Sequence, residues 1–307
     1  MNYKILEGDC IDSLKTLDDE SVNCCVTSPP YWGLRDYGES DQLGLEETPE
    51  EYVANMVKVF SEVKRVLTKD GTLWLNLGDS YCGTGHKGDY RDPKHKQARN
   101  GQSFAKNNKI DGLKSKDLVG IPWRVAFALQ ADGWYLRQDI IWHKPNPMPE
   151  SVTDRCTKSH EYIFLLSKSP KYYYDHEAVK EKAKTEPQSR NKNREGYNAD
   201  YPKGDRFSEG DRVFGADGLA NKRSVWTVNT RPYPEAHFAT YPTKLIRPCI
   251  QAGCPKGGIV LDPFGGSGTT AEVANELHRD AILCELNPEY CDLIEQRLSL
   301  TQMEMFV

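Results

Sequence analysis

The chain has 307 residues, of which 38% are hydrophobic and 28% charged, and its formal net charge is −5. This composition is typical of a globular protein, long enough for one large α/β domain with a sizeable insertion. It argues against a membrane protein, since no run reaches the roughly 20 apolar residues of a membrane span. The charged first segment, with Lys4, Glu7 and Asp9, does not have the pattern of a signal peptide.

Nine cysteines lie along the chain without a CxxC pair or the Cys/His spacing of a metal site. We expect reduced thiols in an intracellular, cytoplasmic protein, and we predict no metal site. The chain also has no internal repeat and no low-complexity tract.

Basic charge is concentrated in two stretches. Residues 82–117 hold nine Lys or Arg against four Asp or Glu, a net +5, and residues 180–223 hold eleven against eight, a net +3. Such stretches suit loops that follow a phosphate backbone. Solvated surface loops explain the charge equally well.

The N-terminal half of the chain is predicted to alternate strands with helices. The segment Tyr3–Cys10 is expected to be a strand that ends in a Gly-Asp turn. The other expected strands are Ser21–Cys25, Thr72–Leu77, Trp134–Trp142, His160–Leu166 and Tyr172–Tyr174. The expected helices are Ile11–Leu17, a long one from Thr48 that is stopped by Gly71, and Ile121–Gln130. The long helix begins with a capping box of Thr48 and Glu51 around Pro49. Its core face is expected to be Val53, Met56, Val57, Phe60, Val63 and Leu67.

The segment Val26–Trp32 directly follows a buried strand and contains two successive prolines. Prolines exclude both a helix and a central strand position, so the chain must leave the sheet there in a stiff, extended loop. The loop places the Ser28 hydroxyl, the Pro29 carbonyl and the Tyr31 ring at the C-terminal end of a strand. In an open α/β sheet that end binds ligands.

The C-terminal part has the pattern of a βαβ unit. After a short ordered segment at Ser224-Val225-Trp226, the expected elements are a helix at Thr243–Ala252, a strand at Gly258–Asp262, a glycine loop at Pro263–Gly268, a helix at Thr269–Leu277, a strand at Asp280–Glu285 and a helix at Pro288–Leu298. Such a unit predicts a mostly parallel sheet with right-handed crossovers.

The glycine loop is predicted to bind a cofactor. Gly266, Gly268 and Ala271 fit the pattern G-x-G-x-x-A, so a dinucleotide site and a nicotinamide-dependent oxidoreductase remain competitors. Asp262 at the strand end would repel a pyrophosphate but suits a ligand that bears a sulfonium, which favours S-adenosylmethionine. A simple loop cap is the alternative for Asp262. Glu285, at the end of the next strand, is placed to accept hydrogen bonds from ribose hydroxyls.

Thr27-Ser28-Pro29-Pro30-Tyr31-Trp32, together with Asp262-Pro263-Phe264-Gly265-Gly266-Ser267-Gly268-Thr269-Thr270, resembles the two principal motifs of the DNA amino-methyltransferases. The catalytic tetrapeptide of that family corresponds to Ser28-Pro29-Pro30-Tyr31 here. It comes first in the chain and the glycine loop comes last, as in the β group of the family. The resemblance covers most of the chain. It implies a Rossmann-like, S-adenosylmethionine-dependent methyltransferase fold with a mixed, mostly parallel sheet, helices on both faces and an inserted target-recognition region.

The resemblance also assigns site residues. Those implied for the cofactor are Asp9, Cys10, Asp262, Phe264, Gly266, Gly268, Thr269 and Glu285, and those implied for catalysis are Ser28, Pro29, Pro30 and Tyr31. Residues 236–242 resemble the segment that lines the methionine pocket. By position, residues 1–175 would be the catalytic part, 176–223 the target-recognition insertion and 224–307 the cofactor-binding part of the same domain.

The tetrapeptide suits methylation of an exocyclic amino group. That nitrogen is a poor nucleophile because its lone pair is delocalised into the ring. Two acceptors, Ser28 Oγ and the Pro29 carbonyl, can hold its two N–H bonds and direct the lone pair at the methyl group. Tyr31 can stack on a base that has swung out of the duplex. A rigid turn with core aromatics is the alternative for this segment.

In the family, serine at the first position mostly accompanies N4-methylcytosine, so we expect a cytosine-N4 enzyme and keep adenine N6 as the alternative. A DNA-binding module without a cofactor is a further possibility. Double-stranded DNA is the expected partner, and a homodimer and a cognate restriction endonuclease are possible ones. The residues considered for contacts with the target base or DNA are Trp32, Trp142, Lys144, Arg190, Lys192, Arg194 and Arg206.

Overall fold

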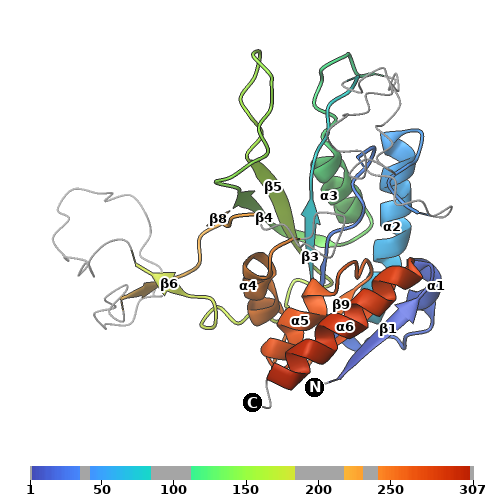
Figure 1. The fold of residues 1–307 in the computed structure, drawn as a ribbon, viewed down its shortest axis with the longest axis vertical. Helices are drawn as coiled ribbons and strands as arrows, with labels where there is room; N and C mark the ends of the chain where they lie inside the picture. Colours follow the sequence, from blue (N-terminus) through green and yellow to red (C-terminus); the bar gives the residue numbers. More distant parts are fainter. Residues whose placement is uncertain (1, 35–41, 84–111, 184–217, 231–240, 305–307) are drawn as a thin grey trace, which may run out of the picture. The chain divides into compact units, whose positions relative to one another are not determined.

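The computed structural model describes residues 2–34, 42–83, 112–183, 218–230 and 241–304 (Figure 1). The chain divides into two compact units, one formed by residues 1–175 with 224–307 and the other by residues 176–223. In the smaller unit, β6 (Glu181–Lys182) pairs antiparallel with β7 (Leu219–Ala220).

The larger unit is built on an eight-stranded sheet in the order β1-β10-β9-β2-β3-β5-β4-β8. Its strands are β1 (Tyr3–Glu7), β2 (Val22–Thr27), β3 (Leu67–Leu77), β4 (Tyr135–His143), β5 (His160–Ser167), β8 (Val225–Thr227), β9 (Ile259–Asp262) and β10 (Asp280–Glu285). Strands β1, β10, β9, β2 and β3 are parallel, β5 is antiparallel to both β3 and β4, and β8 is parallel to β4. The predicted mixed, mostly parallel sheet is confirmed.

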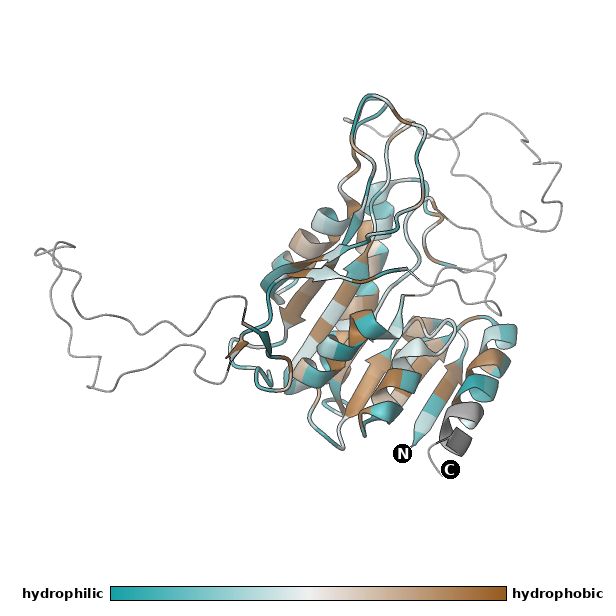
Figure 2. Ribbon diagram, turned by 60° about the vertical axis from the view of Figure 1, so that its left-hand side comes forward, coloured by the Kyte–Doolittle hydropathy of each residue, from teal (hydrophilic) through white to brown (hydrophobic). Residues whose placement is uncertain are grey.

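Helices cover both faces of this sheet. The helices are α1 (Cys10–Lys15), α2 (Pro49–Val66), α3 (Ile121–Ala131), α4 (Thr243–Gly253), α5 (Thr269–Glu276) and α6 (Pro288–Glu304). Side chains alternate between the faces of a strand, and in β3 Leu73 and Leu75 join the core cluster beneath α2, whereas Trp74 packs against Gly253 of α4. Figure 2 shows the hydrophobic residues gathered on the central strands.

The capping box at the start of α2 is confirmed. Thr48 Oγ1 accepts from the Glu51 N–H at 3.2 Å, the Glu51 carboxylate accepts from the Thr48 N–H at 3.2 Å, and Pro49 is the first helical residue. The predicted core face of α2 is only partly correct. Tyr52 and Val59, which were not predicted, are fully buried, whereas the predicted Val53 and Val57 are partly exposed.

Two predicted helix ends and one predicted strand were wrong. Gly71 does not stop α2, which ends at Val66, and the chain continues directly into β3 with Gly71 inside that strand. Tyr172–Tyr174 is not a strand, since this segment is held by single contacts such as the Tyr173 N–H to the Asp70 carbonyl at 2.9 Å. Helix α6 continues past Leu298 to Glu304.

Candidate active site

The two motif loops lie side by side at the carboxyl edge of the sheet. From β2 the chain crosses through α2 to β3 on one side, and from β9 it crosses through α5 to β10 on the other, so the crossovers diverge between β2 and β9. Such a switch point in strand order is where open α/β sheets bind ligands. The loop after β2 begins at Ser28 and the loop after β9 begins at Pro263, so both flank this point.

Asp262 joins the two loops. Its fully buried carboxylate accepts from Thr27 Oγ1 at 2.6 Å, from the Phe264 N–H at 3.1 Å, from Thr270 Oγ1 at 2.6 Å and from the Tyr241 hydroxyl at 2.9 Å. Burial raises the pKa of Asp262 to about 6, although the four donors oppose that shift. Asp262 therefore caps the glycine loop, and when ionised it also leaves a negative charge at the strand end.

The proline loop after β2 is held rigidly. Pro29 is buried, and the Tyr52 hydroxyl donates to the Pro30 carbonyl at 2.9 Å. No donor among the residues that the structure describes reaches the Pro29 carbonyl. Ser28, which is partly exposed, donates its hydroxyl proton to the Tyr31 hydroxyl at 3.3 Å. The loop thus presents a hydroxyl oxygen and a carbonyl oxygen beside the switch point.

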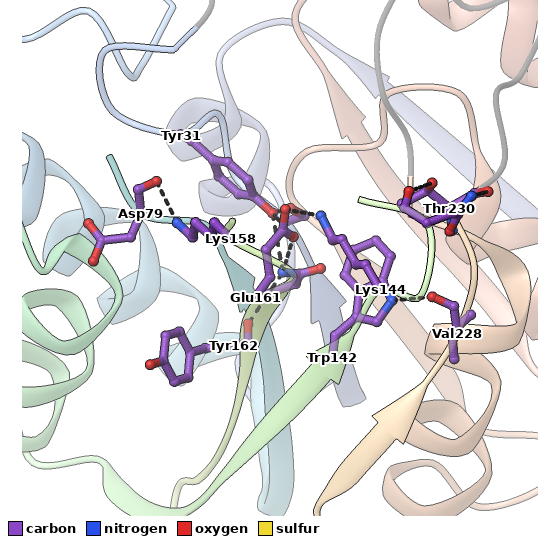
Figure 3. Close-up of polar contacts among 12 residues, drawn as sticks. Tyr31, Asp79, Trp142, Lys144, Lys158, Glu161, Tyr162, Val228 and Thr230 are labelled. Atoms are coloured by element: carbon purple, nitrogen blue, oxygen red, sulfur yellow. Dashed lines mark hydrogen bonds and ion pairs between the residues drawn. The ribbon is translucent and has the colours of Figure 1, made fainter. Parts of the chain in front are cut away.

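Tyr31 belongs to a polar cluster at the starts and ends of three strands (Figure 3). Its hydroxyl donates to Glu161 Oε2 at 2.9 Å and accepts from Asn76 Nδ2 at 3.2 Å, and Lys144 Nζ donates to the other oxygen of Glu161. Burial, together with the charge of Glu161, raises the pKa of Tyr31 well above its usual value, so the phenol remains a donor.

The ring of Tyr31 packs against the backbone just after β3. A Cβ at Gly78 would lie 2.5 Å from Tyr31 Cε2, so a side chain at that position would displace the ring. One side of the ring is therefore occupied by protein. The predicted stacking of Tyr31 on a base stays a prediction.

The glycine loop makes two left-handed turns, at Gly266 (φ +51°) and Gly268 (φ +77°), which side chains rarely tolerate. The Gly266 N–H donates to Glu285 Oε2 at 2.7 Å, and burial raises the pKa of Glu285. On the other side, Arg297 donates to the Ser267 carbonyl at 2.8 Å and to Thr269 Oγ1 at 3.1 Å. Thr269, predicted to bind the cofactor, thus holds the loop itself.

The remaining predicted cofactor residues lie near the same edge. Asp9 follows β1 and caps α1, since its Oδ1 accepts from the N–H groups of Ile11 at 2.9 Å and Asp12 at 3.1 Å. Cys10 is buried, and Phe264 is partly buried against the core cluster. The strand order places the ends of β1, β10 and β9 next to one another, which brings Asp9, Glu285 and Asp262 to one edge.

Three of the seven predicted DNA-contact residues lie within the described part of the chain, and each makes contacts inside the protein. Trp32 is 6% exposed, and its indole N–H donates to the Glu46 carbonyl at 3.0 Å. Trp142 is 4% exposed and donates to the Val228 carbonyl at 2.8 Å. Both rings therefore lie in the protein interior, and their proposed contact with the target base stays a prediction. Lys144 lies over the Trp142 ring, 4.2 Å from its centre, in addition to its pairing with Glu161. Arg190, Lys192, Arg194 and Arg206 lie outside the described residues, as do positions 236–240.

Sequence reasoning missed Arg297, Asn76 and the role of Glu161, and it gave Tyr241 only a place in the segment 236–242 that resembles the lining of the methionine pocket. Tyr241 lies just before α4 and also pairs with Thr270 Oγ1, while burial raises its pKa well above the usual value. Glu161 was predicted only as part of the expected strand His160–Leu166. Glu161 is the second residue of β5, next to the end of β3, and no local sequence signal places it at this edge.

Within the part of the chain that the structure describes, no three His, Cys, Asp or Glu side chains gather as metal ligands would. No helix there is long and apolar enough to cross a membrane. The nine cysteines form no disulfide.

Comparison with known proteins agrees with this geometry. A family model described as DNA methylase matches residues 22–296. The type II methyltransferase M.Cfr9I of Citrobacter freundii is 49% identical over 294 residues, which is 96% of this chain and 87% of the relative. The type II methyltransferase M.SmaI of Serratia marcescens is 48% identical over 295 residues, covering 96% and 90% of the two chains.

Two solved structures share the fold. The PvuII DNA methyltransferase (cytosine-N4-specific) has a TM-score of 0.63 at 19% identity, over 94% of this chain and 84% of that one. TTHA0409 from Thermus thermophilus, a DNA modification methylase complexed with S-adenosyl-L-methionine, has a TM-score of 0.59 at 22% identity, over 98% and 96%. The expected Rossmann-like methyltransferase fold is confirmed.

Proposed function

The chain belongs to the DNA methylase family, and from that premise we propose that it transfers a methyl group from S-adenosylmethionine to the exocyclic N4 of a cytosine within a specific sequence of double-stranded DNA. The observation that carries the proposal is the position of Ser28 Oγ and the Pro29 carbonyl at the switch point, one strand away from the glycine loop. The Thr27–Asp262 bond joins the two loops.

The loop after β9 fits the cofactor. Gly266 and Gly268 bring the backbone close to a ligand, and Gly268 begins α5 without a side-chain cap. Asp262 supplies negative charge toward a sulfonium, and Asp9 and Glu285 offer carboxylates at the neighbouring strand ends. When bound, S-adenosylmethionine supplies an electrophilic methyl group. The nicotinamide-dependent alternative is not supported, because the match over the whole chain is to methylases.

The chain's own residues then orient the target. Ser28 Oγ and the Pro29 carbonyl accept the two N–H bonds of the amino group, which directs the nitrogen lone pair toward the donor site. A base inside the duplex cannot reach this site, so the cytosine must swing out of the stack. The unit of residues 176–223 is the proposed target-recognition region. A homodimer and a cognate restriction endonuclease stay predictions.

The choice of cytosine rests on Ser28 and on the solved relative whose title names it cytosine-N4-specific. The deciding experiment is to incubate unmethylated plasmid with the protein and isotopically labelled S-adenosylmethionine and to identify the modified nucleosides by mass spectrometry. We expect labelled N4-methylcytosine. Labelled N6-methyladenine would transfer the assignment to adenine, and the absence of any labelled nucleoside would refute the proposal.

Cofactor affinity is expected to depend on pH through Asp262. Its pKa in the folded protein is about 6, so its ionised fraction falls about tenfold between pH 7.5 and pH 5. If the ionised form binds the sulfonium, affinity at pH 5 is about tenfold weaker than at pH 7.5. Burial raises the pKa of Glu285 too, and its protonation acts in the same direction.

Calorimetric titration with S-adenosylmethionine at both pH values checks this expectation. In Asp262→Asn the group no longer titrates, so the difference between the two pH values should shrink. Equal affinity of the wild type at pH 5 and pH 7.5 would contradict the electrostatic role given to Asp262.

A further inference from the structure

A chain of hydrogen bonds runs inward from the proposed catalytic hydroxyl to an ion pair. Ser28 Oγ donates to the Tyr31 hydroxyl at 3.3 Å, and that hydroxyl donates to Glu161 Oε2 at 2.9 Å. Lys144 Nζ pairs with Oε1 of the same carboxylate. Figure 3 shows Tyr31 and Lys144 approaching Glu161 from opposite sides.

Asn76 fixes the direction of this chain. Its Nδ2 faces three acceptors, namely the Tyr31 hydroxyl at 3.2 Å, Glu161 Oε2 at 3.2 Å and the Tyr162 carbonyl at 3.3 Å. Turning the amide over would place an oxygen against these oxygens, so the amide donates here. The tyrosine oxygen then accepts from Asn76, and its own proton points at Glu161.

The direction of the Tyr31 proton also determines the direction of the Ser28 proton. With the Tyr31 proton directed at Glu161, the tyrosine oxygen is an acceptor toward Ser28, and the Ser28 proton turns inward. The lone pairs of Ser28 Oγ are then left for the N–H bond of a substrate. Each bond in such a chain polarises the next, which makes Ser28 Oγ a stronger acceptor than an isolated hydroxyl.

Stability does not explain the ion pair at the inner end. The side chains of Lys144 and Glu161 are only 17% and 15% exposed, and burying two charges costs about as much as their attraction returns. Asn76 Oδ1, which is buried and has no hydrogen-bond partner among the described residues, adds a further cost. A cluster that costs stability at the edge of a ligand site points to a role in the reaction.

We propose that Glu161, held by Lys144 and Asn76, sets the direction of the Ser28–Tyr31 chain and takes up the proton that the methylated nitrogen loses. The inference rests on the proposed function. As the N–C bond forms and the C–S bond breaks, the sulfur keeps the electron pair of the C–S bond and the nitrogen becomes cationic. As this charge develops, in the same step, an N–H proton passes to Ser28 Oγ, the Ser28 proton passes to Tyr31, and the Tyr31 proton passes to Glu161, while the N–H electron pair returns to nitrogen.

The test is a double-mutant cycle with Tyr31→Phe and Glu161→Gln, read as the single-turnover rate of methyl transfer to DNA. Each substitution interrupts the same chain, and each is expected to slow transfer about 10²-fold, the lower range for proton-transfer catalysis. Because both act on one chain, the double variant should be no slower than the slower single variant. The affinity for S-adenosylmethionine should be unchanged.

Glu62→Gln is the matched control, because Glu62 pairs with Arg65 at 2.9 Å, is 26% exposed and lies on α2 away from the site. It should transfer methyl groups at the wild-type rate. A wild-type rate for Glu161→Gln, or losses that multiply in the double variant, would overturn the inference. If the wild type itself labels no DNA, the proposed function has failed instead.

A second measurement needs no variant. Because several protons move in the same step, the wild-type single-turnover rate should fall in D₂O. The rate should also depend non-linearly on the fraction of D₂O in the solvent. A rate independent of the D₂O fraction would overturn the inference even if the variants at Glu161 did not fold.

Discussion

Replacing Ser28 with alanine is expected to lower the single-turnover rate of methyl transfer about 10²- to 10³-fold, the usual loss when one group that stabilises the transition state is removed. Ser28 Oγ is one of two acceptors for the target amino group, and the Pro29 carbonyl alone cannot hold both N–H bonds. The hydroxyl contacts only Tyr31 among the described residues, so its loss should leave the fold intact. Affinity for S-adenosylmethionine should not change.

Ser21→Ala is the control for this prediction. Ser21 precedes the same strand at its opposite end, and its hydroxyl donates to the Asp18 carbonyl at 2.7 Å. This variant should transfer methyl groups as the wild type does. Rapid-quench measurement with labelled cofactor compares the three proteins, and an unimpaired Ser28→Ala would remove the proposed role of Ser28.

Asp262→Ala is expected to lower the free energy of unfolding by about 2–4 kcal/mol and to abolish cofactor binding. The substitution opens a cavity and removes the acceptor of four donors, from Thr27, Phe264, Thr270 and Tyr241. The hydroxyl oxygens of Tyr241 and Thr270 lie 2.5 Å apart, so in the variant one can donate to the other, which limits the loss. The ends of β2 and β9 would then no longer be joined through this carboxylate.

Urea unfolding measures the first effect and calorimetry the second. Asp280→Ala is the matched control, since Asp280 lies in the neighbouring strand β10 and, within the described part of the chain, its carboxylate accepts only the Asn2 N–H, at 2.8 Å near the surface. Its variant should keep both stability and cofactor binding. An Asp262→Ala protein as stable as Asp280→Ala would show that the carboxylate does not hold the two loops together.

The sequence predicted correctly those helix and strand ends that are determined by capping residues or by a nearby proline. Thr48, Pro49 and Glu51 determine the start of α2, and Asp280–Glu285 was predicted with its observed bounds because it lies between a helix end and a proline. The predicted end of α2 was wrong because no glycine or proline lies at Val66, where the helix ends. Leu67 instead pairs with Val22 of β2 and begins β3, and a Cβ at Gly71 would lie 3.0 Å from the Leu67 side chain.

The sequence predicted the two loops of the site separately, but it did not predict the contacts between residues that lie far apart in the chain. The motifs predicted Ser28 and Asp262, but nothing local indicates that Asp262 accepts from Thr27, 235 positions away. Glu161 meets Tyr31 across 130 positions, and only the antiparallel pairing of β5 with β3 brings it to the carboxyl edge. Asp9 and Thr269 were expected to face the cofactor, and the structure shows the caps and loop contacts that they also make.

A crystal structure of the protein with S-adenosylhomocysteine and duplex DNA that carries its target sequence would test the central claim most directly. We predict that one cytosine stands outside the duplex, with N4 within hydrogen-bond distance of both Ser28 Oγ and the Pro29 carbonyl and facing the sulfur of the cofactor product. A target base bound elsewhere, or a cofactor product bound away from the loop after β9, would contradict the account.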